Sequence, residues 1–146
     1  MSVIAWDGKT IAADKQATYA DVKETTYKIK KLANGDIVGF TGTLPKALTL
    51  VRWYEDGSSP KKYPKFQEGE DWIRFVVFKT NGKILYYEST SEPIEVLEEK
   101  IAFGCGRDLA LGAMEMGADA VTAVKVASKY SVYCGMGVDS FEFKRK

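Results

Sequence analysis

Serine at position 2 is the first residue of this 146-residue chain that could act as a nucleophile, and the chain contains no histidine. A serine hydroxyl is a weak nucleophile and needs an adjacent base, which in the Ser-His-Asp arrangement is an imidazole. Without histidine, the base must be a carboxylate, a lysine or a free amine. The α-amine of Ser2 itself is a candidate once Met1 is removed, because its reference pKa of roughly 7.7–8.0 leaves part of it neutral near pH 7.

The composition narrows the function classes further. The net charge is +1, so no global field attracts nucleic acid or a membrane surface. The two cysteines, Cys105 and Cys134, are too few for a disulfide framework or a four-cysteine zinc site. The chain has neither a glycine-rich phosphate motif nor an apolar run long enough to cross a membrane. We therefore expect one cytoplasmic domain over residues 1–146, with neither a nucleic-acid nor a membrane partner.

Alternating apolar segments predict β-hairpins at three places. Residues 2–6 and 10–14 flank an Asp-Gly turn, and residues 25–32 and 36–42 flank an Asn-Gly turn. Residues 71–90 form a third hairpin around a second Asn-Gly pair. These turns favour antiparallel pairing, so the sequence predicts antiparallel sheets.

Helical spacing predicts three helices between the strands. In residues 44–57 one apolar face is expected to hold five residues: Leu44, Ala47, Leu48, Val51 and Tyr54. Residues 107–116 form the second helix, and Asp119 is a plausible N-cap for the third, which runs to about residue 129. Residues 58–70 are expected to form a surface loop, and residues 99–106, 130–134 and 139–146 to form or end in strands. This order of elements indicates an α+β fold with helices on the outer faces of the sheets.

Four short motifs occur in this chain in a fixed order. They are "AADKQAT" at residues 12–18, "KIKKL" at 28–32, "VGFTG" at 38–42 and "GCG" at 104–106. Together with the strand that begins at Ser2, they make the chain resemble the N-terminal nucleophile (Ntn) hydrolases of the proteasome β-subunit type, in particular the HslV-like peptidases. The resemblance covers most of the chain. It implies an αββα sandwich of two antiparallel sheets, with the second helix of one layer reduced or missing, because only the loop of residues 58–70 stands in its place.

The resemblance assigns a role to several residues. The family's threonine nucleophile falls on Ser2, its strand-end aspartate on Asp14 and its active-site lysine on Lys28. The glycine whose N–H stabilises the oxyanion falls on Gly42, and the serine of the family's "G-S-G" turn falls on Cys105. The resemblance therefore implies a peptidase with these five residues in its catalytic site.

These roles agree with elementary chemistry. A lysine beside the Ser2 amine and hydroxyl would lower the pKa of both through like charge and hydrogen bonding, and Asp14 would keep Lys28 charged and in place. An N–H group that faces a developing oxyanion is worth about 2.7–4 kcal/mol of barrier in comparable sites. Each residue also has an ordinary structural interpretation: Asp14 as a turn cap, Lys28 on a solvated strand face and Cys105 as a small core residue.

Two further sets of residues are candidates for binding. Thr18 and Leu44 are candidates for the substrate pocket, although both also fit ordinary packing. The family often binds a monovalent cation through backbone carbonyls after its last helix, and these positions correspond to Ser128, Ser131 and Cys134. The resemblance thus implies no required cofactor, with Na⁺ as a candidate ligand.

Two functions remain open from the sequence. The first is a threonine/serine-type peptidase that works inside a ring of its own copies, cleaves polypeptides and is fed by an ATP-dependent unfoldase. The second is a catalytically inactive relative that keeps Met1 and serves as a scaffold or assembly protein. The state of residue 1 separates them, because a retained Met1 would block the Ser2 amine.

Overall fold

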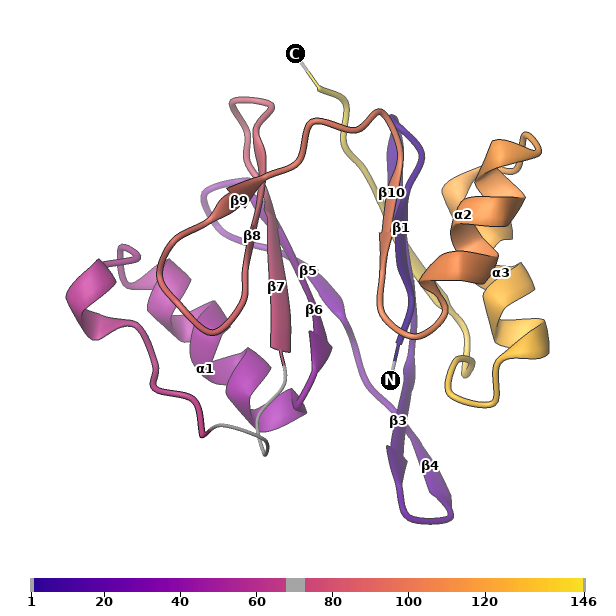
Figure 1. The fold of residues 1–146 in the computed structure, drawn as a ribbon, viewed down its shortest axis with the longest axis horizontal. Coiled ribbons are helices and arrows are strands. Elements are labelled where there is room, and N and C mark those ends of the chain that lie inside the picture. The colour runs from indigo at the N-terminus through magenta and orange to yellow at the C-terminus, as the bar shows by residue number, and fades with distance from the viewer. Residues whose placement is uncertain (1, 68–72, 146) are drawn as a thin grey trace.

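A computed structural model describes residues 2–67 and 73–145, and its strands form two main antiparallel sheets and one small hairpin (Figure 1). The first sheet has the order β10 (Ile101–Phe103), β1 (Ile4–Trp6), β2 (Thr10–Asp14) and β11 (Val138–Glu142). The second has the order β5 (Ile29–Lys31), β6 (Ile37–Gly42), β7 (Ile73–Phe78), β8 (Ile84–Tyr87) and β9 (Ile94–Glu95). The small hairpin joins β3 (Gln16–Tyr19) to β4 (Val22–Thr25).

The two sheets pack face to face between two helical layers (Figure 1). Helix α1 (Leu44–Glu55) covers the outer face of the second sheet, and helices α2 (Arg107–Glu115) and α3 (Ala120–Tyr130) cover the outer face of the first. Three apolar clusters fill the three interfaces between these layers. In the described part of the chain only a single 3₁₀ turn, η1 (Pro60–Lys62), follows α1 in its layer. The αββα sandwich with one reduced layer is therefore confirmed.

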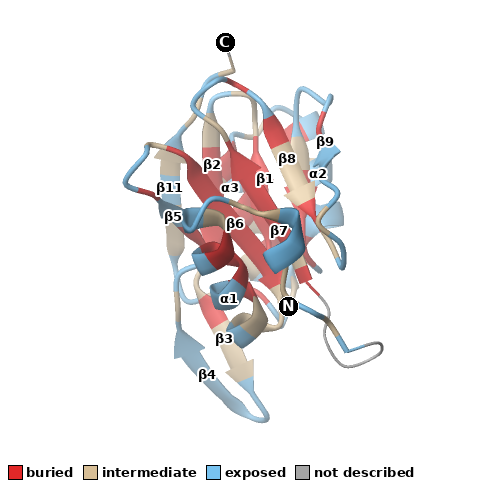
Figure 2. Ribbon diagram, turned by 90° about the vertical axis from the view of Figure 1, so that its left-hand side faces the viewer, coloured by how far each residue is buried: buried red, intermediate tan, exposed pale blue. Residues whose placement is uncertain are grey.

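Strand β1 lies in the centre of the first sheet and is buried on both faces (Figure 2). Its side chains alternate, so that Ile4 and Trp6 pack between the sheets while Val3 and Ala5 pack under the helices. Ser2 lies two residues before the first residue of this strand and is itself buried. The hairpin register pairs Ile4 with Ala13, which brings the end of β2 alongside the start of β1.

Most of the predicted elements are present. The hairpins at Asp7-Gly8 and Asn34-Gly35 form, and the Asp119 carboxylate caps α3 by accepting a 2.8 Å hydrogen bond from the Thr122 N–H. The third hairpin forms from Ile73 onward, whereas residues 68–72, which belong to the predicted loop and hairpin, lie outside the described residues. Hairpin β3–β4, which extends beyond the sandwich, was not predicted, because its strands are short and mostly polar; β4 is exposed along its whole length (Figure 2).

Two predictions about local structure are wrong. Residues 130–134 do not form a strand: Tyr130 ends α3 and the following residues turn back toward β2. The predicted apolar face of α1 is wrong at Leu48, which is 42% exposed; Ala47 and Val51 are buried and Leu44 and Tyr54 pack against the same cluster, as predicted. Leu50 and Trp53 complete the buried face. Leu48 and Leu50 both fit a helical repeat of apolar residues, so the sequence alone does not distinguish them. The packing of α1 on β6 and β7 decides which of the two is buried.

Candidate active site

The turn of Gly104, Cys105 and Gly106 holds Ser2 at the start of β1. The Gly106 N–H donates to the Ser2 carbonyl oxygen at 3.1 Å, and the Ser2 nitrogen lies 3.2 Å from the Cys105 Sγ. Gly104 has φ +96°, and a Cβ atom there would lie 2.1 Å from the Ser2 carbonyl oxygen. Only glycine allows this close approach, so the position of Ser2 requires a glycine at residue 104.

Asp14 and Lys28 form a buried ion pair beside Ser2. The Lys28 Nζ lies 2.8 Å from Asp14 Oδ1, and the two side chains are 6% and 0% exposed. Asp14 also accepts hydrogen bonds from three backbone N–H groups: Val3 at 3.0 Å, Gln16 at 3.3 Å and Gly135 at 3.1 Å. A buried carboxylate is tolerated only when its lone pairs are satisfied in this way. Asp14 therefore fixes the Lys28 ammonium and is itself fixed by the backbone.

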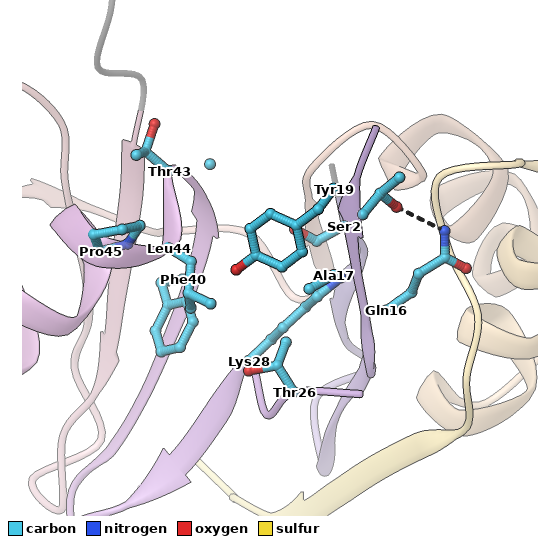
Figure 3. Close-up of a pocket in the computed structure, with 12 residues that line it drawn as sticks. Ser2, Gln16, Ala17, Tyr19, Thr26, Lys28, Phe40, Thr43, Leu44 and Pro45 are labelled. Carbon is cyan, nitrogen blue, oxygen red and sulfur yellow. Dashed lines mark hydrogen bonds between the residues drawn. The ribbon is translucent and has the colours of Figure 1, made fainter. Parts of the chain in front are cut away.

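A pocket of about 370 Å³ opens at the ends of β3 and β6. Ser2, Lys28 and Gly42 all line it, together with Thr18 and Leu44 (Figure 3). Its remaining lining residues are Gln16, Ala17, Tyr19, Thr26, Phe40, Thr43 and Pro45. The structure thus brings the predicted nucleophile, lysine and oxyanion glycine to one cavity, with both predicted substrate-binding residues on its wall.

Gly42 ends β6 directly before the first turn of α1. Its φ of +109° lies in the left-handed region that favours glycine. Helix α1 has no acidic side chain in its first turn, and Thr43, Leu44 and Pro45 place that turn at the pocket wall. The positive end of a helix dipole therefore borders the cavity in which a peptide carbonyl would gain negative charge.

Cys105 lies outside the pocket lining and contacts Ser2 from the other side. Its side chain is exposed, and its sulfur meets both the nitrogen of Ser2 and, at 3.8 Å, the Ser2 carbonyl oxygen. Cys105 therefore contacts the backbone of the predicted nucleophile residue, and its catalytic role stays a prediction.

The predicted cation-binding residues lie at the carboxyl end of α3. Ser128 belongs to its last turn, Ser131 is its C-cap, and the Ser131 carbonyl accepts a 3.3 Å hydrogen bond from the Cys134 N–H. Burial, followed by the nearby charge of Asp14, raises the pKa of the Cys134 thiol to about 11, so this thiol is neutral at physiological pH. Over residues 2–67 and 73–145, no group of three or more His, Cys, Asp or Glu side chains is placed to hold a metal ion.

Two residues of the site were not predicted. Gly135 donates its N–H to Asp14, and Gln16 is a buried side chain that reaches the same loop. Gln16 lies within the "AADKQAT" motif, and this motif was the one sign in the sequence that could have indicated it. Nothing in the sequence indicates that Gly135, 119 positions later, lies next to Gln16. In the part of the chain that the structure describes, no helix has the length and apolar character needed to cross a membrane.

The comparisons with known proteins agree with this geometry. No family model matches the chain. The ATP-dependent protease subunit HslV of Borrelia hermsii (strain HS1 / DAH) is 31% identical, with 90% of this chain and 89% of the relative aligned. The subunit of the same name from Caldanaerobacter subterraneus subsp. tengcongensis is 28% identical, with 87% of each chain aligned.

Solved structures of low sequence identity share the fold. BPH from Thiobacillus denitrificans, solved in complex with epoxomicin, has a TM-score of 0.74 at 20% identity over the whole of both chains. The eukaryotic HslV from Trypanosoma brucei has a TM-score of 0.72 at 17% identity over 99% of each chain. The predicted peptidase class is confirmed by the HslV relatives from Borrelia hermsii and Caldanaerobacter subterraneus. The chain belongs to the HslV family of protease subunits, within the Ntn hydrolases.

Proposed function

We propose that this chain is the proteolytic subunit of a ring-shaped peptidase in which Ser2, freed by removal of Met1, is the nucleophile. The observation that carries the proposal is the shared pocket of Ser2, Lys28 and Gly42, with Lys28 held 2.8 Å from the buried Asp14 carboxylate. In a chain without histidine, an α-amine and a lysine are the bases that such a pocket offers.

In the proposed reaction the Ser2 Oγ attacks the carbonyl carbon of the scissile peptide bond while its proton passes to the Ser2 α-amine. The Lys28 ammonium stabilises the alkoxide that develops on Oγ, and Asp14 keeps Lys28 aimed at it. The Gly42 N–H donates to the oxyanion of the tetrahedral intermediate. When the intermediate collapses, the protonated α-amine gives its proton to the leaving amine, and an ester remains on Ser2. Water then cleaves this ester by the same steps.

The pocket supports a preference for uncharged substrate side chains. Among the described residues that line it, Lys28 is the single one with a charged side chain, and the Lys28 ammonium is already paired with Asp14. Phe40, Leu44 and Tyr19 supply apolar surface, while Thr18 and Thr26 supply hydroxyls. We propose that the substrate is an extended polypeptide with an apolar side chain next to the scissile bond, because burying an unpaired charge there would be costly.

Assembly and supply of substrate follow from the family. The Borrelia and Caldanaerobacter relatives are ATP-dependent protease subunits by name, and this chain covers 89% and 87% of their lengths. We propose that this chain likewise forms a ring with its own copies and receives polypeptides from an ATP-dependent unfoldase. Enclosure in a ring would keep a peptidase pocket away from folded cellular proteins.

The carboxyl end of α3 fits a monovalent cation better than a transition metal. Backbone carbonyls are hard oxygen donors, and the last carbonyls of a helix lack partners within the helix. The backbone oxygens of Ser128, Ser131 and Cys134 would hold such an ion, and the buried Ser128 hydroxyl has no hydrogen-bond partner in the structure. A bound Na⁺ would supply rigidity to the loop that leads to Gly135, and no chemical step passes through it.

The decisive experiment compares chains that differ only at their amino end. We would produce one form with a free Ser2 and one with an unremovable residue before it, verify both by intact mass, and measure hydrolysis of fluorogenic peptides. Turnover and epoxomicin inactivation are expected only for the free form. If the free form shows no turnover, or if native material retains Met1, the inactive scaffold is favoured.

Assembly is tested separately by native mass spectrometry of the free form. A ring of identical subunits is expected, and a strict monomer at high concentration would contradict the enclosed peptidase.

A further inference from the structure

Gln16 is a buried amide that the proposed reaction does not use. Its side chain is 2% exposed and projects from β3 toward the loop that follows α3 (Figure 3). The Nε2 atom donates to the Val132 carbonyl oxygen at 3.0 Å and to Thr18 Oγ1 at 3.0 Å. One N–H bond of the amide therefore ties β3 to a loop more than a hundred positions away in the sequence, and the other stays within β3, where it orients the amide.

The same loop supplies one of the hydrogen bonds that hold Asp14. The Gly135 N–H donates to Asp14 Oδ2 at 3.1 Å, and the Gly135 carbonyl accepts from the Lys15 N–H at 2.9 Å. A Cβ atom added at Gly135 would lie 2.9 Å from the Gln16 Oε1, so the amide also packs against this glycine. Gln16 thus contacts the loop at Val132 and at Gly135.

Little else holds this loop to β3. Val132, Tyr133 and Met136 are exposed, and the buried residue of the loop, Cys134, packs into the cluster under the helices and not against β3. The described hydrogen bonds between the loop and the residues around β3 come from Lys15, Gln16 and Asp14. Because few other contacts tie this loop to β3, removal of the hydrogen bond from Gln16 should change the position of the Gly135 N–H.

We propose that Gln16 is a positioning residue: its amide clasps the loop of residues 131–136 so that the Gly135 N–H stays on Asp14, and Asp14 in turn aims Lys28 at Ser2. This inference rests on the proposed function for its catalytic consequence. The clasp itself is a property of the fold and can be measured without activity.

The structural test is hydrogen–deuterium exchange of residues 131–136 in the folded protein. Gln16→Met keeps the length of the side chain and removes both donors, so we expect faster exchange of the Gly135 amide. The matched control is Asp119→Ala, because Asp119 Oδ1 accepts from the Thr122 N–H at 2.8 Å and caps the opposite end of α3. Unchanged exchange in Gln16→Met, or the same increase in Asp119→Ala, would overturn the clasp whether or not the protein is a peptidase.

The kinetic test separates positioning from substrate binding. With a fluorogenic peptide we expect Gln16→Met to lower kcat by up to about 100-fold while KM changes little, because misplacement of a catalytic group acts on the chemical step. Gln16→Glu should behave alike, since a carboxylate cannot donate to the Val132 carbonyl, and Asp119→Ala should keep its kcat. A rise in KM alone would show that Gln16 acts through the substrate pocket instead.

A double-mutant cycle completes the test. Gly135→Ala should force the Gln16 amide aside, so the effects of Gly135→Ala and Gln16→Met on kcat should be less than additive. Full additivity would mean that the two residues act independently and would contradict the clasp. If the wild-type chain with a free Ser2 shows no turnover, the proposed function fails, and the exchange experiment alone decides on Gln16.

Discussion

The Lys28 Nζ lies 2.8 Å from Oδ1 of Asp14, and both side chains are buried next to the pocket that Ser2 lines. A buried ion pair contributes little net stability, because desolvation of the two charges offsets their attraction. Its value here is geometric: Asp14 takes three backbone N–H groups and one ammonium, so the position of Lys28 is determined by the sheet and by the loop after α3.

Removal of Lys28 should therefore affect folding and activity in different ways. Lys28→Met leaves the Asp14 charge buried without its ammonium, and we expect a loss of about 3–5 kcal/mol in the free energy of unfolding together with loss of turnover. Lys28→Met combined with Asp14→Asn should regain much of the stability and none of the activity. Urea unfolding and peptide hydrolysis measure the two effects, and an active double variant would contradict the role of Lys28.

Substitution of Ser2 should separate the hydroxyl from the fold. Ser2→Ala should abolish hydrolysis with little change in the melting temperature, since the side chain is small and precedes β1. Ser2→Thr should keep or raise activity, because threonine presents the same hydroxyl with a stiffer side chain. Both variants need a free amino end, verified by intact mass. Turnover in Ser2→Ala would exclude this residue as the nucleophile.

The effect on kcat of replacing Cys105 should depend on whether the new side chain can form a hydrogen bond. Cys105→Ser should change kcat by less than about tenfold, because a hydroxyl can replace the sulfur that lies 3.2 Å from the Ser2 nitrogen. Cys105→Val has a similar size and no such group, and we expect the larger loss from this variant. Steady-state kinetics with one fluorogenic peptide would decide, and equal activity of both variants would show that the contact has no catalytic role.

The turn that holds Ser2 should not tolerate a side chain. Gly104→Ala would place a Cβ 2.1 Å from the Ser2 carbonyl oxygen at a φ of +96°, so we expect a loss of stability of about 1–3 kcal/mol or more and a displaced amino end. Gly112→Ala in the exposed part of α2 is the control and should stabilise the protein by about 0.5–1 kcal/mol, since nothing lies within 4 Å of its Cβ. Thermal unfolding of the two variants tests this contrast.

Cys134 should make stability depend on alkaline pH. Its pKa is raised from 9.0 to about 11 by burial and by the charge of Asp14. Between these values the unfolded thiol loses its proton while the folded thiol keeps it, so its contribution to stability is present below pH 9 and is lost as the pH rises to about 11. Urea unfolding at pH 8, 10 and 11 should show a steeper decline in the wild type than in Cys134→Ala, and parallel declines would contradict the shift.

Local chemistry in the sequence determined the elements that carry the site. The Asp7-Gly8 and Asn34-Gly35 pairs specified hairpins, and Asp119 specified the start of α3 through the hydrogen bond that its side chain accepts. The motifs around Asp14 and Lys28, together with the lack of histidine, were enough to indicate an Ntn hydrolase. These signals act over a few residues, where period and turn chemistry decide the conformation.

The tertiary structure alone decided which distant residues complete the site. Residues 130–134 carry a strand-like pattern, yet they turn because the Gly135 N–H is needed by the buried Asp14 carboxylate 121 positions away. Gln16 and Gly104 lie within the "AADKQAT" and "GCG" motifs, but their roles follow only from contacts with Val132 and with Ser2. Such contacts depend on how the layers close on each other, because a buried charge or carbonyl must be satisfied by whatever group the fold brings to it.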